Sequence, residues 1–224
     1  MFLSFFLSNN FQRRRLLKQT QSSVMQDYLA NAFPEGKTLL KDTDIVAIDF
    51  ETTGLSIEKD NIISVGAVQI TNMEIALGSS YHQVVNSECK LPEQSIVIHN
   101  ITDNTLAQGV KPKEAIQQLL ALLSGKVMLV HNAQIELGFL KKLCREFYKT
   151  DFIIPVIDTQ RLAQRRFERQ GEIYRDNELR LFNLRQRYGL PQYKAHNAQM
   201  DALATAELFL AMTDKHARLR DYLS

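Results

Sequence analysis

Two kinds of segment follow each other along this chain, and their order constrains the fold more than any other feature. Three β-rich runs with short connections come first, at residues 45–48, 62–70 and 76–85, with turn residues at Asn72 and Gly78. Runs joined this closely pair antiparallel. Strand-like and helical segments then alternate, with strands predicted at 127–131 and 153–157 and helices at 113–123, 133–148, 159–170, 181–188 and 198–212. We therefore expect an α/β protein whose mixed sheet carries helices on its faces.

The first forty residues have the pattern of an arm. Apolar residues at mostly helical spacing run from Asn9 to Phe33, and Pro34-Glu35-Gly36 ends the run. One interpretation is a helix packed on the core. The other is an arm that docks onto a partner or nucleic acid through the basic run Arg13-Arg14-Arg15. We expect three parts: a helical arm at 1–40, a main domain at 41–214 and a C-terminal tail at 215–224.

The charge is nearly balanced but unevenly distributed. Twenty-seven basic and 25 acidic residues give a net charge of +2, which excludes a uniformly basic coat that grips duplex DNA by charge alone. Residues 1–40 carry five basic and two acidic side chains, and residues 145–194 carry eleven and seven. These stretches sum to +3 and +4, so the remainder carries −5. The pattern indicates an acidic centre between basic flanks.

Cysteine usage and hydropathy bear on the compartment. Cys89 and Cys144 are far apart and lack metal-finger spacing, as expected of reduced thiols. The apolar run Met1 to Leu7 is much shorter than the ~20 residues that a membrane span needs. We therefore expect a cytoplasmic protein without a membrane partner.

Acidic residues inside apolar sequence are the most informative feature. Asp49 and Glu51 end a strand two residues apart, so their side chains leave on the same face. Adjacent buried carboxylates resist ionising together unless a cation or a shared proton relieves them. Glu136 and Asp201 each lie in the first turns of a predicted helix, where an acid often only complements the helix dipole. The combination is more specific than any single acid.

Three motifs carry a family resemblance. They read Val46-Ala47-Ile48-Asp49-Phe50-Glu51-Thr52-Thr53-Gly54-Leu55, Val130-His131-Asn132-Ala133-Gln134-Ile135-Glu136, and His196-Asn197-Ala198-Gln199-Met200-Asp201-Ala202, with Ile98-His99-Asn100-Ile101-Thr102 as a supporting element. In this order and spacing the chain resembles the DEDDh 3′→5′ exonucleases, the superfamily of the proofreading epsilon subunit of bacterial DNA polymerase III. The second-motif acid of the family is normally Asp, and the Glu136 found here resembles a branch with Glu at that position.

The resemblance implies an RNase H-like fold, with a mixed five-stranded sheet flanked by helices, and a set of catalytic roles. Asp49, Glu51, Glu136 and Asp201 would bind two divalent cations, and oxygen-only ligands favour Mg²⁺ or Mn²⁺. His196, five residues before Asp201, would be the general base. The tyrosine branch of the superfamily does not apply, because Asn197 stands where that branch has Tyr.

The resemblance also implies substrate contacts. Thr52, Thr53 and Leu55 would hold the 3′-terminal nucleotide, with Leu55 wedged between the last two bases. His99 is either a substrate contact or a loop histidine, and Asn132 either lies near the scissile phosphate or caps a helix. His131 is expected to be structural, and Phe50 to point into the core. A further group either lines a basic groove or forms a solvated helix face: Arg161, Arg165, Arg166 and Arg169.

We therefore expect a metal-dependent enzyme that removes nucleotides from the 3′ end of single-stranded or frayed DNA. Two alternatives stay open: an RNA or short-oligonucleotide 3′→5′ exonuclease, and a catalytically weak nucleic-acid-binding or regulatory module on the same fold. The sequence also leaves open a homodimer, or a regulatory or polymerase partner bound through the N-terminal arm.

Overall fold

A five-stranded mixed sheet forms the centre of the computed structural model, which describes residues 8–87 and 102–224. The strands are β1 (Ile45–Thr52), β2 (Ile62–Thr71), β3 (Glu74–Val84), β4 (Val127–Val130) and β5 (Val156–Asp158), in the spatial order β3-β2-β1-β4-β5. β1, β2 and β3 form an antiparallel meander, whereas β4 and β5 run parallel to β1. This mixed α/β sheet confirms the predicted fold class.

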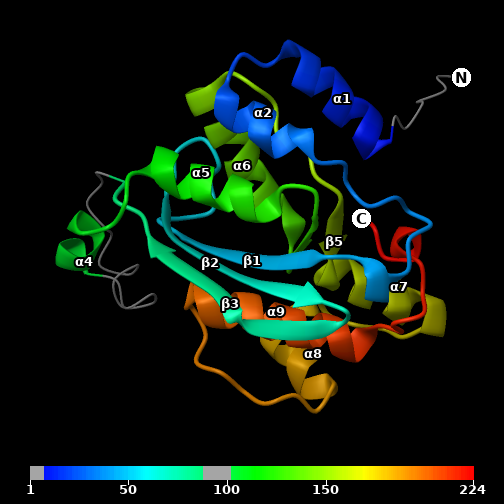
Figure 1. Cartoon of the computed structure of the whole chain (residues 1–224). Helices are drawn as coiled ribbons and strands as arrows, with labels where there is room; N and C mark the ends of the chain where they lie inside the picture. Colours follow the sequence, from blue (N-terminus) through cyan, green and yellow to red (C-terminus); the bar gives the residue numbers. More distant parts are fainter. Residues whose placement is uncertain (1–7, 88–101) are drawn as a thin grey trace, which may run out of the picture.

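Helices cover both faces of the sheet (Figure 1). The α-helices of the described residues are α1 (Asn9–Gln19), α2 (Ser23–Ala30), α4 (Asp103–Ala107), α5 (Pro112–Leu123), α6 (Ala133–Tyr148), α7 (Thr159–Gln170), α8 (Leu181–Arg187) and α9 (Ala198–Met212). α5 and α6 pack on one face and α9 on the other. No helix in residues 8–87 and 102–224 is long and apolar enough to cross a membrane.

The N-terminal segment forms two helices where the apolar pattern predicted one. Thr20 is extended and its hydroxyl bonds to that of Thr150 at 2.7 Å, and the Ser22 side chain then caps α2. Tyr28 of α2 is buried and donates to the Ile153 carbonyl at 2.7 Å. The segment therefore packs on the core, as the first interpretation expects.

Arg13 corrects the docking interpretation of the basic run. Its side chain is buried and its guanidinium donates to the carbonyls of Leu29 and Ala30, which lie at the end of α2. Arg13 thus ties α1 to α2 and is not a docking residue, whereas Arg14 and Arg15 are exposed.

The hairpin between β2 and β3 corrects a second detail. Asn72 and Met73 both have positive φ, at 55° and 61°, as a two-residue hairpin turn requires. Gly78, predicted as a turn residue, lies inside β3.

β5 begins only at Val156, later than predicted, since Pro155 has no N–H to donate to a neighbouring strand.

The last residues pack against the sheet. Leu219 is buried, residues Leu39 and Arg218 form a β-bridge, and so do Ile157 and Leu223. The Asp158 N–H donates to the Ser224 hydroxyl at 3.1 Å. Residues 223–224 therefore lie along the edge of the sheet at β5, whereas residues 215–220 run beside residues 36–41.

Candidate active site

The alternation of side chains along β1 places two carboxylates on the α9 face of the sheet. Ile45 and Ala47 pack in the cluster beneath α9, and Asp49 and Glu51 continue the same row. Phe50 points the opposite way, into the core under α5 and α6, as predicted. Both acids lie toward the carboxyl end of the central strand.

Two helix N-termini bring the other acids. Asp201 lies in the first turn of α9, where the Asn197 side chain accepts from the Met200 N–H at 3.1 Å. Glu136 lies in the first turn of α6, directly after β4, and is only 4% exposed. Since β4 runs parallel to β1, α6 begins at the edge of the sheet where Asp49 and Glu51 lie.

A glycine lets α9 approach the sheet closely. Gly66 of β2 lies opposite Asp49 in the register, and a Cβ there would come within 2.1 Å of the Ala198 carbonyl carbon. Any side chain at position 66 would push away the helix turn that carries Asp201. Sequence reasoning assigned Gly66 no role, because the need for a glycine comes from a contact between distant segments.

Three of the acids meet at one point. Asp49, Glu51 and Asp201 each offer a carboxylate oxygen, and these oxygens lie within 4.8 Å of one another. Glu136 lies outside this triad, but its charge contributes to raising the pKa of Asp49. The structure therefore brings the four predicted carboxylates into one electrostatic unit.

The raised pKa values of three of these acids show that it is unfavourable to bury several negative charges together. Burial raises the pKa of Asp49 well above its usual value, and the charges of Glu136, Glu51 and Asp201 raise it further. Burial, with the charge of Asp158 adding, raises the pKa of Glu136 to about 8. Burial and the Glu51 charge raise the pKa of Asp201 to about 6, although the His196 N–H and charge act in the opposite direction. Ionising the whole cluster is unfavourable without a compensating charge.

These residues suit a divalent cation. All donors are carboxylate oxygens, the set that Mg²⁺, Mn²⁺ and Ca²⁺ prefer. In the described part of the chain, the buried Oε2 of Glu136 and Oδ1 of Asp201 have no hydrogen-bond partner. A cation would satisfy such oxygens and stabilise the ionised forms.

His196 lies beside Asp201 of this cluster. Its side chain is exposed, its φ is 65°, and its N–H donates to Asp201 Oδ2 at 2.9 Å. The charge of the imidazole also lowers the pKa of Asp201, so the two groups are close. The histidine predicted as general base is thus next to a predicted metal ligand.

The loop after β1 is tied to itself and also to α6, because the Lys142 ammonium donates to the Asp60 carbonyl at 3.0 Å. The Thr53 hydroxyl donates to Asp60 Oδ1 at 2.8 Å, and the Thr52 hydroxyl donates to the Gly54 carbonyl at 2.8 Å. A Cβ at Gly54 would meet the Asp60 carboxylate at 2.6 Å. Leu55 stands out from this loop, with 78% of its surface exposed. The loop is therefore ordered, with one large apolar side chain presented to solvent.

Asp158 is a second residue that sequence reasoning missed. Its carboxylate accepts from the N–H groups of Asn132 at 3.2 Å and Ala133 at 3.0 Å, which begin α6. It also accepts from the N–H groups of Gln160 and Arg161, which begin α7. One buried side chain therefore caps both helices, including the one that carries Glu136.

These hydrogen bonds exclude the helix-capping role for the Asn132 side chain. Its side chain makes no capping hydrogen bond, and its backbone is left-handed with φ 74°, so the helix-cap role belongs to Asp158. His131 contacts the Thr159 hydroxyl through Nδ1 at 2.8 Å, and burial lowers its pKa to about 4. These contacts fit the predicted structural role of His131.

A second histidine lies near the cluster. Ser64 of β2 pairs with Glu51 in the register, and its hydroxyl is 2.9 Å from Nε2 of His82 on β3. Burial lowers the pKa of His82, while the Glu51 charge acts against this. The sequence offered no signal for His82, since only strand pairing brings it close. His99 lies outside the described residues.

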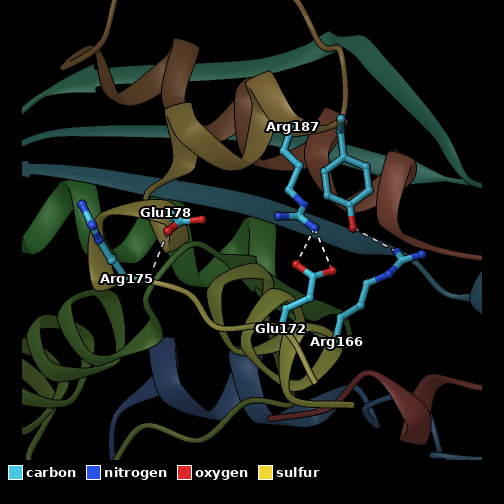
Figure 2. Close-up of polar contacts among 6 residues, drawn as sticks. Arg166, Glu172, Arg175, Glu178 and Arg187 are labelled. Atoms are coloured by element: carbon cyan, nitrogen blue, oxygen red, sulfur yellow. Dashed lines mark hydrogen bonds and ion pairs between the residues drawn. The ribbon is translucent and has the colours of Figure 1, made fainter. Parts of the chain in front are cut away.

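The arginines of α7 and α8 are partly engaged with neighbours (Figure 2). Arg187 pairs with both carboxylate oxygens of Glu172, at 2.8 and 2.6 Å, and Arg166 donates to the Tyr188 hydroxyl at 2.9 Å. Arg161 and Arg169 are exposed. Part of the proposed basic group thus holds α7 and α8 together.

Comparison with known proteins agrees with the predicted resemblance. The model of the Exonuclease (RNase_T) family matches residues 46–209. The DNA polymerase III subunit epsilon of Treponema pallidum is 32% identical over 175 residues, which are 77% of this chain and 77% of that protein. The PolC-type DNA polymerase III of Thermotoga maritima is 29% identical over 173 residues, which are 77% of this chain but only 12% of that protein.

A solved structure shows the same fold. The nuclease domain of 3′hExo, described as a DEDDh family member bound to rAMP, superposes with a TM-score of 0.64 at 16% identity, covering 75% of this chain and 90% of that one. The RNase H-like fold is therefore confirmed. With the family model matching most of its length, the chain belongs to the exonuclease family of hydrolases that act on nucleic acids.

Proposed function

We propose that this protein is a divalent-metal-dependent 3′→5′ exonuclease that removes nucleotides from single-stranded or frayed DNA ends. The observation that carries the proposal is the convergence of Asp49, Glu51 and Asp201 within 4.8 Å, beside a buried Glu136. A catalytically weak module would have no need to keep this electrostatically costly cluster.

The proposed reaction uses four metal ligands and one general base. Asp49, Glu51, Glu136 and Asp201 would hold two Mg²⁺ or Mn²⁺ ions per active site. When bound, such ions neutralise charge on the phosphate oxygens and lower the pKa of water. The His196 imidazole accepts the proton of the attacking water as general base, since it is exposed next to Asp201.

The substrate would enter over the loop after β1. Leu55 is exposed where a base is to be separated from its neighbour, while Thr52 and Thr53 hold the loop that surrounds the terminal nucleotide. Asn132, freed from a capping role, would lie near the scissile phosphate, and His99 would contact substrate. The exposed Arg161 and Arg169 extend a basic surface for a polyanion.

The relatives' names bear on partners and compartment. The relatives are a polymerase III subunit and a PolC-type polymerase, so a cytoplasmic location and a polymerase or regulatory partner follow as proposals. The exposed Arg14 and Arg15 on α1 are the side chains of the basic run that such a partner would meet. A homodimer through the same arm is the competing arrangement.

The test uses 5′-labelled oligonucleotides with Mg²⁺ or Mn²⁺. Single-stranded DNA, RNA of the same sequence and blunt duplex are compared, and products are resolved at single-nucleotide length. We expect a ladder of shortened DNA products that Asp49→Asn abolishes. A faster ladder on RNA would redirect the proposal to an RNA exonuclease, and no ladder on any substrate with either metal would refute it.

A further inference from the structure

His196 lies in a segment without regular secondary structure. Residues 189–197 connect α8 to α9, and Lys194, His196 and Asn197 are exposed. The left-handed φ of His196 is uncommon for a residue with a side chain. His196 itself lies just outside the hydrogen-bond ladder of α9, so contacts along this segment contribute to its position.

The two ends of this segment are held by backbone groups. At the start, the Leu190 N–H donates to the Arg185 carbonyl at 2.9 Å. At the end, the His196 N–H donates to Asp201 Oδ2 and the Asp201 N–H to the Asn197 carbonyl. The middle of the segment needs its own anchor, because loops with few contacts are the least stable parts of a fold.

A buried arginine supplies that anchor. Arg185 of α8 is 1% exposed, and its guanidinium donates to the Pro191 carbonyl and the Ala204 carbonyl, each at 2.7 Å. One side chain thus joins α8, the 189–197 segment and α9. A buried guanidinium is costly unless a carboxylate pairs with it.

Glu207 of α9 provides the carboxylate and holds the segment as well. Its Oε2 lies 2.8 Å from Arg185 Nη2, while its Oε1 accepts from the Tyr193 hydroxyl at 2.7 Å. The Tyr193 ring also lies over the guanidinium, with 4.6 Å between Arg185 Cζ and the ring centroid. Tyr193 therefore has one contact with each member of the ion pair, three residues before His196.

We propose that Arg185, Glu207 and Tyr193 form a latch that positions His196 over the carboxylate cluster, with Tyr193 as a positioning residue for hydrolysis. The catalytic part of this inference rests on the proposed role of His196. Losing the latch would let the 189–197 segment shift, and displacement of a reacting group by about 1 Å costs up to 10²-fold in rate.

Tyr193→Phe is the mildest test, because it removes the bond to Glu207 and keeps the ring over Arg185. Tyr174→Phe is the matched control, since the Tyr174 hydroxyl also donates to a glutamate, Glu168, at 3.3 Å outside the segment. We expect Tyr193→Phe to lower the single-turnover rate about 10-fold, with substrate affinity within about 2-fold of the parent. The control should leave both unchanged.

A double-mutant cycle separates positioning from other effects. In a His196→Ala background, Tyr193→Phe should change the rate by less than about 2-fold, because the group that it positions is absent. An equal loss in both backgrounds, or no loss in either, would overturn the latch. If His196→Ala alone left the rate unchanged, the general-base assignment would fail instead.

A readout without catalysis tests the latch itself. Trypsin cleaves after the exposed Lys194 only when the segment opens, so its rate reports anchoring. We expect faster cleavage after Lys194 in Tyr193→Phe than in the parent or Tyr174→Phe, measured by mass spectrometry of all fragments that begin at Ala195. Unchanged cleavage would overturn the latch whether or not the protein is active.

Discussion

The carboxylate cluster and the 189–197 segment contribute to the same site, but they are held in different ways. Asp49 and Glu51 belong to the central strand, where the neighbouring residues are buried, and Glu136 and Asp201 belong to helices packed on the sheet. His196 depends on a few partly buried polar contacts. Packing of the core therefore positions the ligand cluster, whereas the latch positions the general base. A local change in the latch can therefore disturb the base without disturbing the ligand cluster.

The largest effect that separates the two regions is expected from His196→Ala. Removing a general base typically costs 10²–10⁴-fold, and we expect a fall of about 10³-fold in hydrolysis rate. Because the side chain is exposed, the melting temperature should stay unchanged. Exonuclease assays and thermal unfolding check this, with the exposed His216→Ala as control. A fall of less than about 10-fold would contradict the assignment.

Gly66→Ala disturbs the core-built region instead. The new methyl group meets the Ala198 backbone, so overpacking should lower the free energy of unfolding by about 1–3 kcal/mol. The displaced Asp201 should lower the rate about 10²-fold. Denaturant unfolding and rate measurements test both effects.

The matched control is Gly78→Ala in β3, where an added Cβ meets nothing within 4 Å. Equal stability and activity for the two alanine variants would show that close approach of α9 does not require position 66 to be a glycine.

Asp158→Asn weakens the caps of α6 and α7 together. An amide nitrogen cannot accept a hydrogen bond, so at least one of the four N–H groups loses its partner. We expect a loss of about 1–2 kcal/mol in unfolding free energy, and a rate about 10-fold lower as Glu136 shifts. The exposed Asp176→Asn serves as control, and an unchanged free energy of unfolding would refute the capping role.

A pH effect concerns the stability of the metal-free protein. The pKa of Glu136 is about 8 in the folded state and 4.5 in the unfolded state. Between these pH values, the folded state therefore binds more protons than the unfolded state. Stability is then fully present below about pH 4.5 and falls as the pH rises toward 8. Thermal unfolding in EDTA should show this decline, and Glu136→Gln should reduce it.

Divalent metal should also reduce the decline, because it stabilises the ionised carboxylate. If the parent and Glu136→Gln showed the same dependence of stability on pH, the raised pKa of Glu136 would be contradicted.

Local patterns predicted much of the fold. The bounds of α6, α7 and α9 match the helices predicted from helical spacing along the sequence. Arg13 departs from the docking interpretation of the basic run, because its side chain is buried. Its partners are carbonyls at the end of α2, sixteen and seventeen residues away, and no local pattern reports such a contact.

The site shows the same division. Asp49, Glu51, Glu136 and Asp201 stood out because acids interrupt apolar segments, and the structure brings them together. Gly66, Asp158 and Tyr193 did not, because each acts through a contact between segments distant in sequence. Their roles depend on strand register and helix approach, which composition and periodicity do not specify.

Cation binding tests the central claim most directly, since the four carboxylates are proposed to hold the metal. Titration with Mn²⁺, with free Mn²⁺ followed by electron paramagnetic resonance, measures affinity without any substrate. We predict that the parent and Glu58→Gln, which removes an exposed charge from the neighbouring loop, bind Mn²⁺ alike. Asp49→Asn should weaken binding at least about 10-fold. Equal affinity in Asp49→Asn and the parent would contradict the account.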